Sequence, residues 1–537
     1  MGESFDREDA AFLSSVDRSH GDHHHRSDSD TNMGSGSFEY VARNTATTEK
    51  IRFRLMVVLL LMVLALETGG IMSMGPGTRI FESIACRNYY LLHDPAKIGA
   101  SGQVNEDLCK INDVQAEVAA IVGYKQFFDG LLSASLAIPY GLLTDRVGRK
   151  RSICLNIPGF FLNLVIILIT LCFPDAFPLR TLWLASLAWF IGGGPVVVFA
   201  NLWTMMTDMT AEEERASVFF NIGVAMFAAQ FIASLMSSWL MTSNPWIPML
   251  IGFSIIMLGL LLALSLPETI PARVSQSKEQ PTVELANLSP EDNGHMDSSF
   301  HANSREKPLP FPKNQSSFED TYSRCRRYLS PYTFIFRNKG ILLLLTAFFL
   351  YRLGCGSDWF LVQYISTRYS WTLAQATFLS SFKAALSIPL FLYVIPSMSR
   401  YLLRSMKADA KDLRLAGISV LFLIIGTFGI AQASSVRVLI PSLVLQTFGS
   451  GFVFLVRSLI TTLVEKEETA RLFTAIEILQ TGGNVLASLT ITRVFQRGLE
   501  IGGSWIGLAW TTASVLFGMV GVAIWLFKLP PVRRAGE

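Results

Sequence analysis

Apolar runs of about twenty residues recur along the chain and alternate with short polar segments. A helix of about twenty apolar residues crosses the hydrocarbon core of a bilayer. Twelve runs have this length, and no soluble core could bury so many of them. They lie near residues 53–75, 117–143, 152–173, 181–206, 216–241, 246–267, 340–364, 372–397, 413–433, 437–464, 472–494 and 504–528. The pattern predicts an all-α polytopic membrane protein with twelve transmembrane helices.

Polar segments divide these helices into two sets of six. Residues 1–52 are rich in Ser, Asp and His and predict a disordered cytoplasmic tail. Residues 271–338 are rich in Ser, Pro, Asn and charge, which is typical of a cytoplasmic linker. We therefore expect a six-helix bundle over 53–270, a second over 339–528, and a short cytoplasmic tail over 529–537.

The placement of Lys and Arg predicts the orientation. Basic residues precede the first helix at Lys50, Arg52 and Arg54, and others follow the second and eighth helices. Loops rich in Lys and Arg stay on the cytoplasmic side, so both termini and the linker should face the cytoplasm. The net charge of +3 is small and its basic residues lie in these loops. It indicates contact with the lipid bilayer and not with nucleic acid.

The two halves resemble each other in sequence. The turn after the fourth helix of the first half reads TDMTAEEERASVFF, and its counterpart in the second half reads TTLVEKEETARLFTA. Aligning Arg215 with Arg471 also superimposes Glu212 on Glu468. Weak symmetry of this kind is expected of a transporter in which two bundles rock about a central site.

One loop carries a specific motif between the second and third helices. The stretch GLLTDRVGRK fits the pattern G-x-L-x-D-R-x-G-R-K without a gap. Its defining residues are Gly141, Leu143, Asp145, Arg146, Gly148, Arg149 and Lys150. We expect Gly141 to permit close helix packing and Gly148 to take the positive φ of a tight turn.

This stretch resembles the signature loop of the major facilitator superfamily, and the likeness extends from the first to the twelfth helix. The resemblance implies two pseudo-symmetric six-helix bundles, a central substrate site and alternating access. It also implies that the loop acts as a conformational latch. A loop that only sets the topology through its positive charge is the alternative.

Ionisable residues inside transmembrane helices are costly and mark functional sites by default. The candidates are Glu67, Lys125, Asp129, Arg352, Asp358, Lys383, Arg457 and Glu477. Glu67 and Arg352 occupy matching positions in the two halves, each roughly 20 Å into its helix. Protonation of Glu67 would weaken its attraction to Arg352 and free the arginine for an anionic or polar substrate group. A structural ion pair without coupling is the alternative.

Two further pairs are expected from spacing. Arg457 and Glu477 should lie at one level on adjacent helices, as a buried pair or as part of an inner vestibule. Lys125 and Asp129 share a helix face at i, i+4. Asp129 is a second candidate proton site, and mutual neutralisation is the other interpretation. Asp358 and Lys383 receive no role.

Six cysteines show no CxxC pair. Cys86 and Cys109 share the first outer loop, where a disulfide is permitted but not required. The stretch HGDHHH in the N-terminal tail has ligand spacing, yet its setting in a disordered tail favours no metal site. We expect no metal, no cofactor and no enzymatic activity, since no P-loop or nucleophile elbow occurs.

The long polar tail and central linker look like those of fungal members of the superfamily. The sequence therefore predicts proton-coupled efflux of a small amphipathic secondary metabolite or xenobiotic by a monomer in the cell membrane, with a vacuolar or other internal membrane as the alternative. The fifth helix, NIGVAMFAAQFIASLMSSW, departs from the proline-containing pattern of drug antiporters. A diffuse similarity to the proton-coupled folate transporter branch, seen in Arg457, favours uptake of a vitamin-like solute instead. A sensor on the same scaffold is a third possibility.

Overall fold

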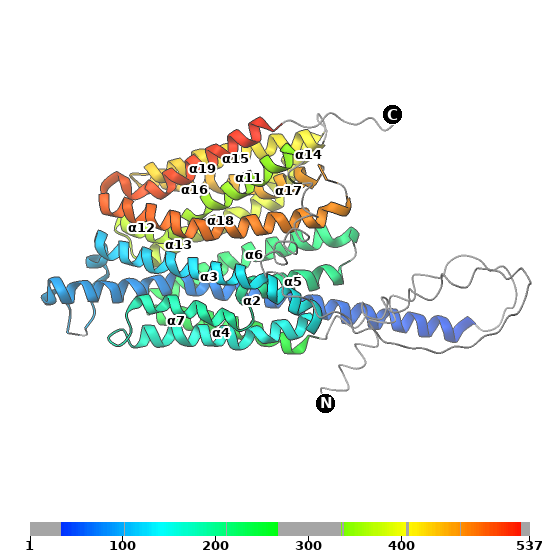
Figure 1. Cartoon of the computed structure of the whole chain (residues 1–537), viewed down its shortest axis with the longest axis horizontal. Coiled ribbons are helices and arrows are strands. Elements are labelled where there is room, and N and C mark those ends of the chain that lie inside the picture. Colours follow the sequence, from blue (N-terminus) through cyan, green and yellow to red (C-terminus); the bar gives the residue numbers. More distant parts are fainter. Residues whose placement is uncertain are drawn as a thin grey trace, which may run out of the picture. The chain divides into compact units, whose positions relative to one another are not determined.

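The computed structural model describes residues 34–100, 102–210, 212–266, 335, 338–403, 408–461, 463–464 and 466–527. The expected linker, apart from residues 335 and 338, and the C-terminal tail lie outside these residues, as does HGDHHH. The described residues of 34–266 and 339–527 belong to one compact unit. In Figure 1 this unit consists of long helices that run side by side.

In the part of the first half that the structure describes, the long helices follow one another in chain order. They are α2 (Gly34–His93), α3 (Asn112–Val147), α4 (Arg149–Cys172), the pair η3 (Leu179–Phe190) and α5 (Gly194–Met209), α6 (Glu212–Met241), and α7 (Trp246–Leu261) with η4 (Leu262–Ser265). Short 3₁₀ turns η1 (Pro95–Lys97) and η2 (Glu106–Cys109) lie in the loop after α2. Helix α2 begins well before residue 53, so the first helix reaches into the segment expected to be a tail.

The second half repeats this arrangement with more breaks inside its helices. Its segments are α11 (Lys339–Gly354) with η6 (Cys355–Phe360) and α12 (Leu361–Tyr369); α13 (Leu373–Pro389) with η7 (Leu390–Val394) and α14 (Ile395–Leu403); α15 (Ala408–Gln432); α16 (Val436–Phe448) with η8 (Gly449–Gly451) and α17 (Phe452–Thr461); α18 (Lys466–Ile501); and η9 (Gly503–Gly507) with α19 (Leu508–Leu526). The described part of each apolar run is thus mainly helical.

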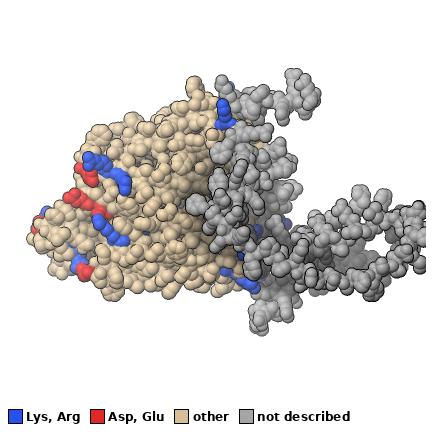
Figure 2. Space-filling view, viewed as in Figure 1, with Lys and Arg blue, Asp and Glu red and all other residues tan. Residues whose placement is uncertain are grey.

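Within the described residues, ten segments are long and apolar enough to span a membrane, or eleven if η3 and α5 together make one bent span. Helix α18 is not among them, because Glu477, Asn484 and Arg493 interrupt its apolar pattern. The count of twelve spans stays a prediction. Figure 2 shows a face on which charged side chains gather toward the two ends and leave an uncharged middle, as lipid contact requires.

The bend in the fourth span of the first half has a definite cause. Helices η3 and α5 meet at 43° across the sequence IGG. Gly192 has φ +93°, and a Cβ there would lie 2.5 Å from the Asn156 Cα. Only glycine fits this position without strain. The Tyr140 hydroxyl donates to the Phe190 carbonyl at 2.6 Å and accepts from the Gly192 N–H at 3.0 Å, which fixes the bend.

The halves meet along two helix pairs, in which α3 packs against α18 and α6 packs against α13. Each half has an apolar core, one around Leu59 and Met62 and the other around Tyr364 and Trp510, and the second core also includes Ala119 of α3. Each bundle therefore has apolar packing of its own. The contact between the bundles is made mainly by the two helix pairs.

Candidate functional site

A cavity of about 540 Å³ lies between the two halves. Its wall comes from α2, α3 and α6 of the first half, and from α11, η6, α12, α13, η8 and α18 of the second. Charged lining residues are Arg352, Asp358 and Lys383; amide residues are Gln230, Gln363 and Asn484; aromatic residues are Phe227, Tyr351 and Trp359. Mixed apolar and convergent polar groups are typical of a small-molecule site. We call this space the central cavity.

Asp358 and Lys383 form an ion pair in the wall of the central cavity. The Lys383 Nζ lies 2.8 Å from an Asp358 carboxylate oxygen, and the Gln446 side-chain amide donates to the other oxygen at 3.3 Å. The sequence marked both residues as charges inside helices but gave them no role. Their pairing joins η6 to α13, and no spacing rule within one helix could reveal it.

Arg352 also lines the central cavity, at the C-terminal end of α11. Its Nε is buried without a hydrogen-bond partner, and none of the described residues forms an ion pair with it. Glu67 neither lines the cavity nor makes a hydrogen bond or ion pair with any residue that the structure describes. The structure therefore does not bring Glu67 and Arg352 together, although their positions in the two halves match.

Asp129 is held by three groups. The Lys125 Nζ lies 2.6 Å from one carboxylate oxygen, while the Ser186 hydroxyl and the Trp189 indole N–H donate to the other at 2.6 Å and 2.7 Å. Both donors belong to η3, so Asp129 ties α3 to the fourth span. These contacts favour the interpretation of mutual neutralisation and packing over that of a second proton site.

Arg457 of α17 and Glu477 of α18 form an ion pair, as their expected common level allows. The Glu477 side chain is 61% exposed, so the pair is not buried. Of the two interpretations of this pair, the exposed position favours the vestibule. The pair lies outside the lining of the central cavity.

The signature loop joins α3 to α4. Gly148 has φ +108°, which confirms the expected positive value. Gly141 differs from expectation, because a Cβ there would meet no atom within 4 Å and so does not serve close packing. Arg146 is exposed, Leu143, Arg149 and Lys150 are half-buried, and the side chain of Asp145 lies outside the described residues. The latch role of this loop stays a prediction.

A buried polar triad that the sequence did not reveal supports this loop. The Thr144 and Ser152 hydroxyls are hydrogen-bonded at 2.8 Å across the turn, and the Asn201 side-chain amide donates to the Ser152 oxygen at 3.1 Å. All three side chains are buried. The triad ties both sides of the loop to α5. Ser, Thr and Asn are common in helices, so the sequence held no distinctive signal.

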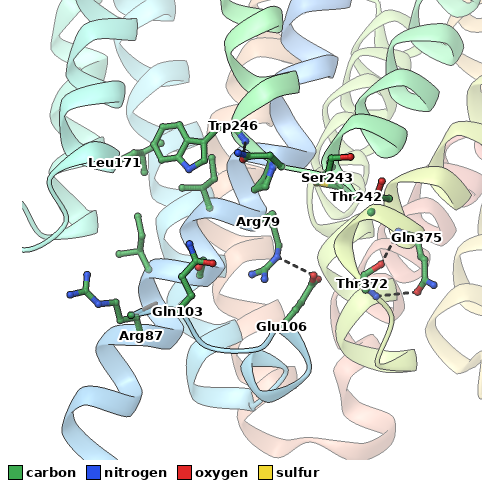
Figure 3. A pocket seen from close by; sticks show the side chains of 18 residues that line it. Arg79, Arg87, Gln103, Glu106, Leu171, Thr242, Ser243, Trp246, Thr372 and Gln375 are labelled. Carbon is green, nitrogen blue, oxygen red and sulfur yellow. Dashed lines mark hydrogen bonds and ion pairs between the residues drawn. The ribbon is translucent and has the colours of Figure 1, made fainter. Parts of the chain in front are cut away.

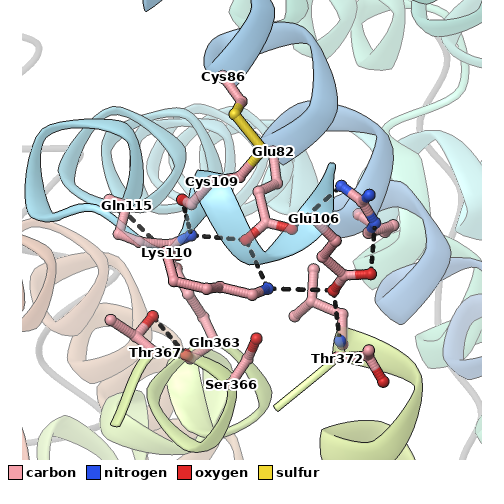
Figure 4. A network of polar contacts seen from close by, with 12 residues as sticks. Glu82, Cys86, Glu106, Cys109, Lys110, Gln115, Gln363, Ser366, Thr367 and Thr372 are labelled. Atoms are coloured by element: carbon pink, nitrogen blue, oxygen red, sulfur yellow. Dashed lines mark hydrogen bonds and ion pairs between the residues drawn. A yellow bond between two sulfur atoms is a disulfide. The ribbon is translucent and has the colours of Figure 1, made fainter. Parts of the chain in front are cut away.

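A ring of four ion pairs lies beside the N-terminal end of α3, whereas the signature loop follows the C-terminal end of that helix. Figure 4 shows this ring from close by. Arg79 and Lys110 each pair with both Glu82 and Glu106, at N–O distances of 2.8 to 3.2 Å. Gln115 adds a hydrogen bond to Glu82 at 2.6 Å. We call Arg79, Glu82, Glu106 and Lys110 the outer cluster. The expected orientation places it on the non-cytoplasmic side.

A disulfide between Cys86 and Cys109 joins α2 to η2 beside the outer cluster. The sequence permitted this disulfide but did not require it. It fixes the loop that carries Glu106 and Lys110 against α2. The sequence could not reveal the cluster, because its four charges come from a helix end and a loop that lie apart in the chain.

Among the described residues, side-chain hydrogen bonds between the halves gather at the same end. The Gln363 side-chain amide donates to the Gln115 carbonyl at 2.7 Å and to the Gln115 side-chain oxygen at 3.0 Å. Glu106 accepts from the Leu373 N–H at 2.8 Å, and Ser238 donates to the Ala374 carbonyl at 2.7 Å. These contacts close the outer end of the interface in this conformation.

Beyond this closure lies a second cavity of about 950 Å³, shown in Figure 3. Arg79 and Glu106 line it, so the outer cluster forms part of its wall. Trp246 and Gln375 contribute from the first and second halves. The polar lining suits a water-filled vestibule.

Comparison with known proteins places this architecture in a family. Residues 120–488 match the family model described as Major Facilitator Superfamily. The chain belongs to the major facilitator superfamily. It is accordingly a multi-pass membrane protein, and the resemblance of the signature loop identified its family correctly.

Named relatives are similar over most of their length. The MFS-type transporter aprT of Aspergillus flavus is 40% identical over 89% of this chain and 89% of its own. The MFS efflux pump atnC of Emericella nidulans is 27% identical over 87% of this chain and 86% of its own. Among solved structures, a D-xylose-proton symporter has a TM-score of 0.55 at 10% identity, covering 87% of this chain and 97% of its own. That likeness shows the fold alone.

Proposed function

We propose that the chain exports a small amphipathic organic molecule, a secondary metabolite or a xenobiotic, by alternating access and in exchange for protons. The observation that carries this proposal is the central cavity, which lies between the halves beneath a closed outer end. In the expected orientation, cargo enters this cavity from the cytoplasmic side. Release then requires that the outer contacts break.

The cavity suits an amphipathic cargo in its surface chemistry. Phe227, Tyr351 and Trp359 offer aromatic surface, while Gln230 and Asn484 offer hydrogen bonds. Similarity to fungal proteins named as a transporter and an efflux pump supports export over uptake.

Proton exchange needs a carboxylate that meets the transport path. Among the described lining residues, Asp358 is the one carboxylate, and it forms an ion pair with Lys383. Glu67 remains an alternative outside the lining. Exchange of Asp358 for Asn would remove the dependence of export on the proton gradient, whereas Glu67→Gln would leave it intact if Asp358 carries the proton.

Deletion of the gene and its re-expression test the direction of transport. Metabolites should accumulate inside the deletion strain and reappear in the medium on re-expression. Re-expression of Asn484→Trp, which fills the central cavity, should fail to restore export. Leu264→Trp, on an exposed helix surface, is the matched control and should restore it. A deletion strain that instead fails to take up a medium component would overturn export in favour of uptake.

A further inference from the structure

The charges of the central cavity do not balance. Its described lining contains two cations, Arg352 and Lys383, and one anion, Asp358. Lys383 and Gln446 occupy both oxygens of that carboxylate, at 2.8 Å and 3.3 Å. Arg352 is left with no ion pair to a described residue and with a buried Nε that lacks a hydrogen bond. Arg352 is therefore the one charge of the described cavity lining that no ion pair compensates.

An uncompensated charge at this place is costly unless something pairs with it. Arg352 is half-buried and its Nε is buried without a partner, so it carries part of the several kcal/mol that complete burial of an ion costs. A guanidinium offers planar paired donors that match a carboxylate, sulfate or phosphate group. A ligand anion that pairs with Arg352 would therefore relieve this cost.

We infer that the cargo of the central cavity is an organic anion whose acidic group binds Arg352. Phe227, Tyr351 and Trp359 then cover its aromatic or apolar body. This inference rests on the proposed function, because it assumes that the molecule bound in the central cavity is transported. The sign of the charge in the cavity can nevertheless be measured without transport. Asp358 and Lys383 neutralise each other, so Arg352 alone sets that sign.

Cys355 provides a reporter inside the cavity, since it lines the space and is a free thiol. In a background with Cys154, Cys172 and Cys325 changed to Ser, Cys355 is the remaining thiol beside the disulfide. The purified full chain is treated with 2-sulfonatoethyl methanethiosulfonate, an anion, or with the trimethylammonioethyl reagent, a cation. Each rate is divided by the rate for a small thiol in water, which removes intrinsic reactivity.

The corrected rate of Cys355 with the anionic reagent should exceed its corrected rate with the cationic reagent, so that the ratio of the first to the second is above one. Arg352→Gln should lower it by about three- to tenfold, because one charge is removed within a few ångströms. Arg352→Lys should keep the ratio, and Arg437→Gln, an exposed arginine of α16, is the matched control that should leave it unchanged. A ratio below one, or one that Arg352→Gln does not change, would overturn the inference.

A second thiol serves as the reporter if Cys355 does not react. Ser380→Cys, also in the lining, replaces it in a background with Cys355→Ser, and the same ratios are expected. Reaction of neither thiol with any reagent would show a cavity closed to small ions and would equally overturn the inference.

Export measurements separate this inference from the proposed function. Metabolites that depend on the chain for export should be acids, retained inside cells that carry Arg352→Gln and partly released by Arg352→Lys. If the exported compounds are neutral or cationic, the inference of an anionic cargo is wrong, but the proposed export function is kept. A deletion without effect on any metabolite would reject export, whatever the thiol ratios show.

Discussion

The outer cluster and the central cavity both hold buried charge, but they balance it differently. In the outer cluster two cations and two carboxylates form a closed ring of four ion pairs. In the cavity one ion pair stands beside Arg352, which has no partner among the described residues. A balanced ring stabilises one arrangement of the chain, whereas an unbalanced charge is available to a ligand. Loss of charge should therefore reduce stability in the first region and function in the second.

The largest effect on stability is expected from Glu82→Gln. The Glu82 side chain is 1% exposed and pairs with both Arg79 and Lys110, which would then share Glu106 alone. Breaking a buried ion pair from one side costs about 3–5 kcal/mol. The Tm of the purified protein should fall clearly. Glu117→Gln, which removes an exposed pair with Arg180, is the matched control and should barely change it.

Loss of the disulfide should have the next largest effect. Cys86→Ser combined with Cys109→Ser frees a loop that spans 23 positions. In the chain-entropy account this costs about 3 kcal/mol of unfolding free energy. Denaturant unfolding should show the loss, and a reductant should produce the same loss in the parent chain but none in the double variant. Equal stability of parent and double variant would mean that the outer cluster holds this loop without the bond.

A double-mutant cycle on Asp358 and Lys383 should show a smaller effect. Both side chains are partly exposed to the cavity, so the coupling energy should be about 1 kcal/mol. Asp358→Asn alone and Lys383→Gln alone should each lower the Tm, and the double variant should recover part of the loss. Simple additivity of the two losses would show that the pair contributes nothing to the fold.

The smallest effect on stability is expected from Arg352→Gln. Since this arginine lacks a described partner, its removal ends a burial cost and should change the unfolding free energy by less than about 0.5 kcal/mol, or raise it. Export should nevertheless fall at least about tenfold, equal to the loss of roughly 1.4 kcal/mol of binding. A large loss of stability in this variant would mean that Arg352 stabilises the fold, as the charges of the outer cluster do.

The sequence predicted the architecture better than the site. Long apolar runs specify membrane helices by composition alone, and the signature loop identified the family through contiguous residues from Gly141 to Lys150. Lys125 and Asp129 meet because i, i+4 spacing is a local rule. These successes depend on features that lie close together in the chain.

The misses concern residues that meet only through packing. Asp358 reaches Lys383 across two helices, and Glu106 reaches the N–H of Leu373 across the two halves. Symmetry between the halves placed Glu67 opposite Arg352 in sequence, but equal depth does not fix the rotation of a helix. Arg352 lines the cavity and Glu67 does not.

A reversible cross-link between Gln115 and Gln363 tests most directly whether cargo leaves through the outer end. Their side chains are 3.0 Å apart across the closed interface. In cells expressing Gln115→Cys with Gln363→Cys, oxidation should stop export and a reductant should restore it. Cells that express either single variant or the parent chain should continue to export under the same treatments. Export that persists at the parent rate after the cross-link has formed would contradict release through this end.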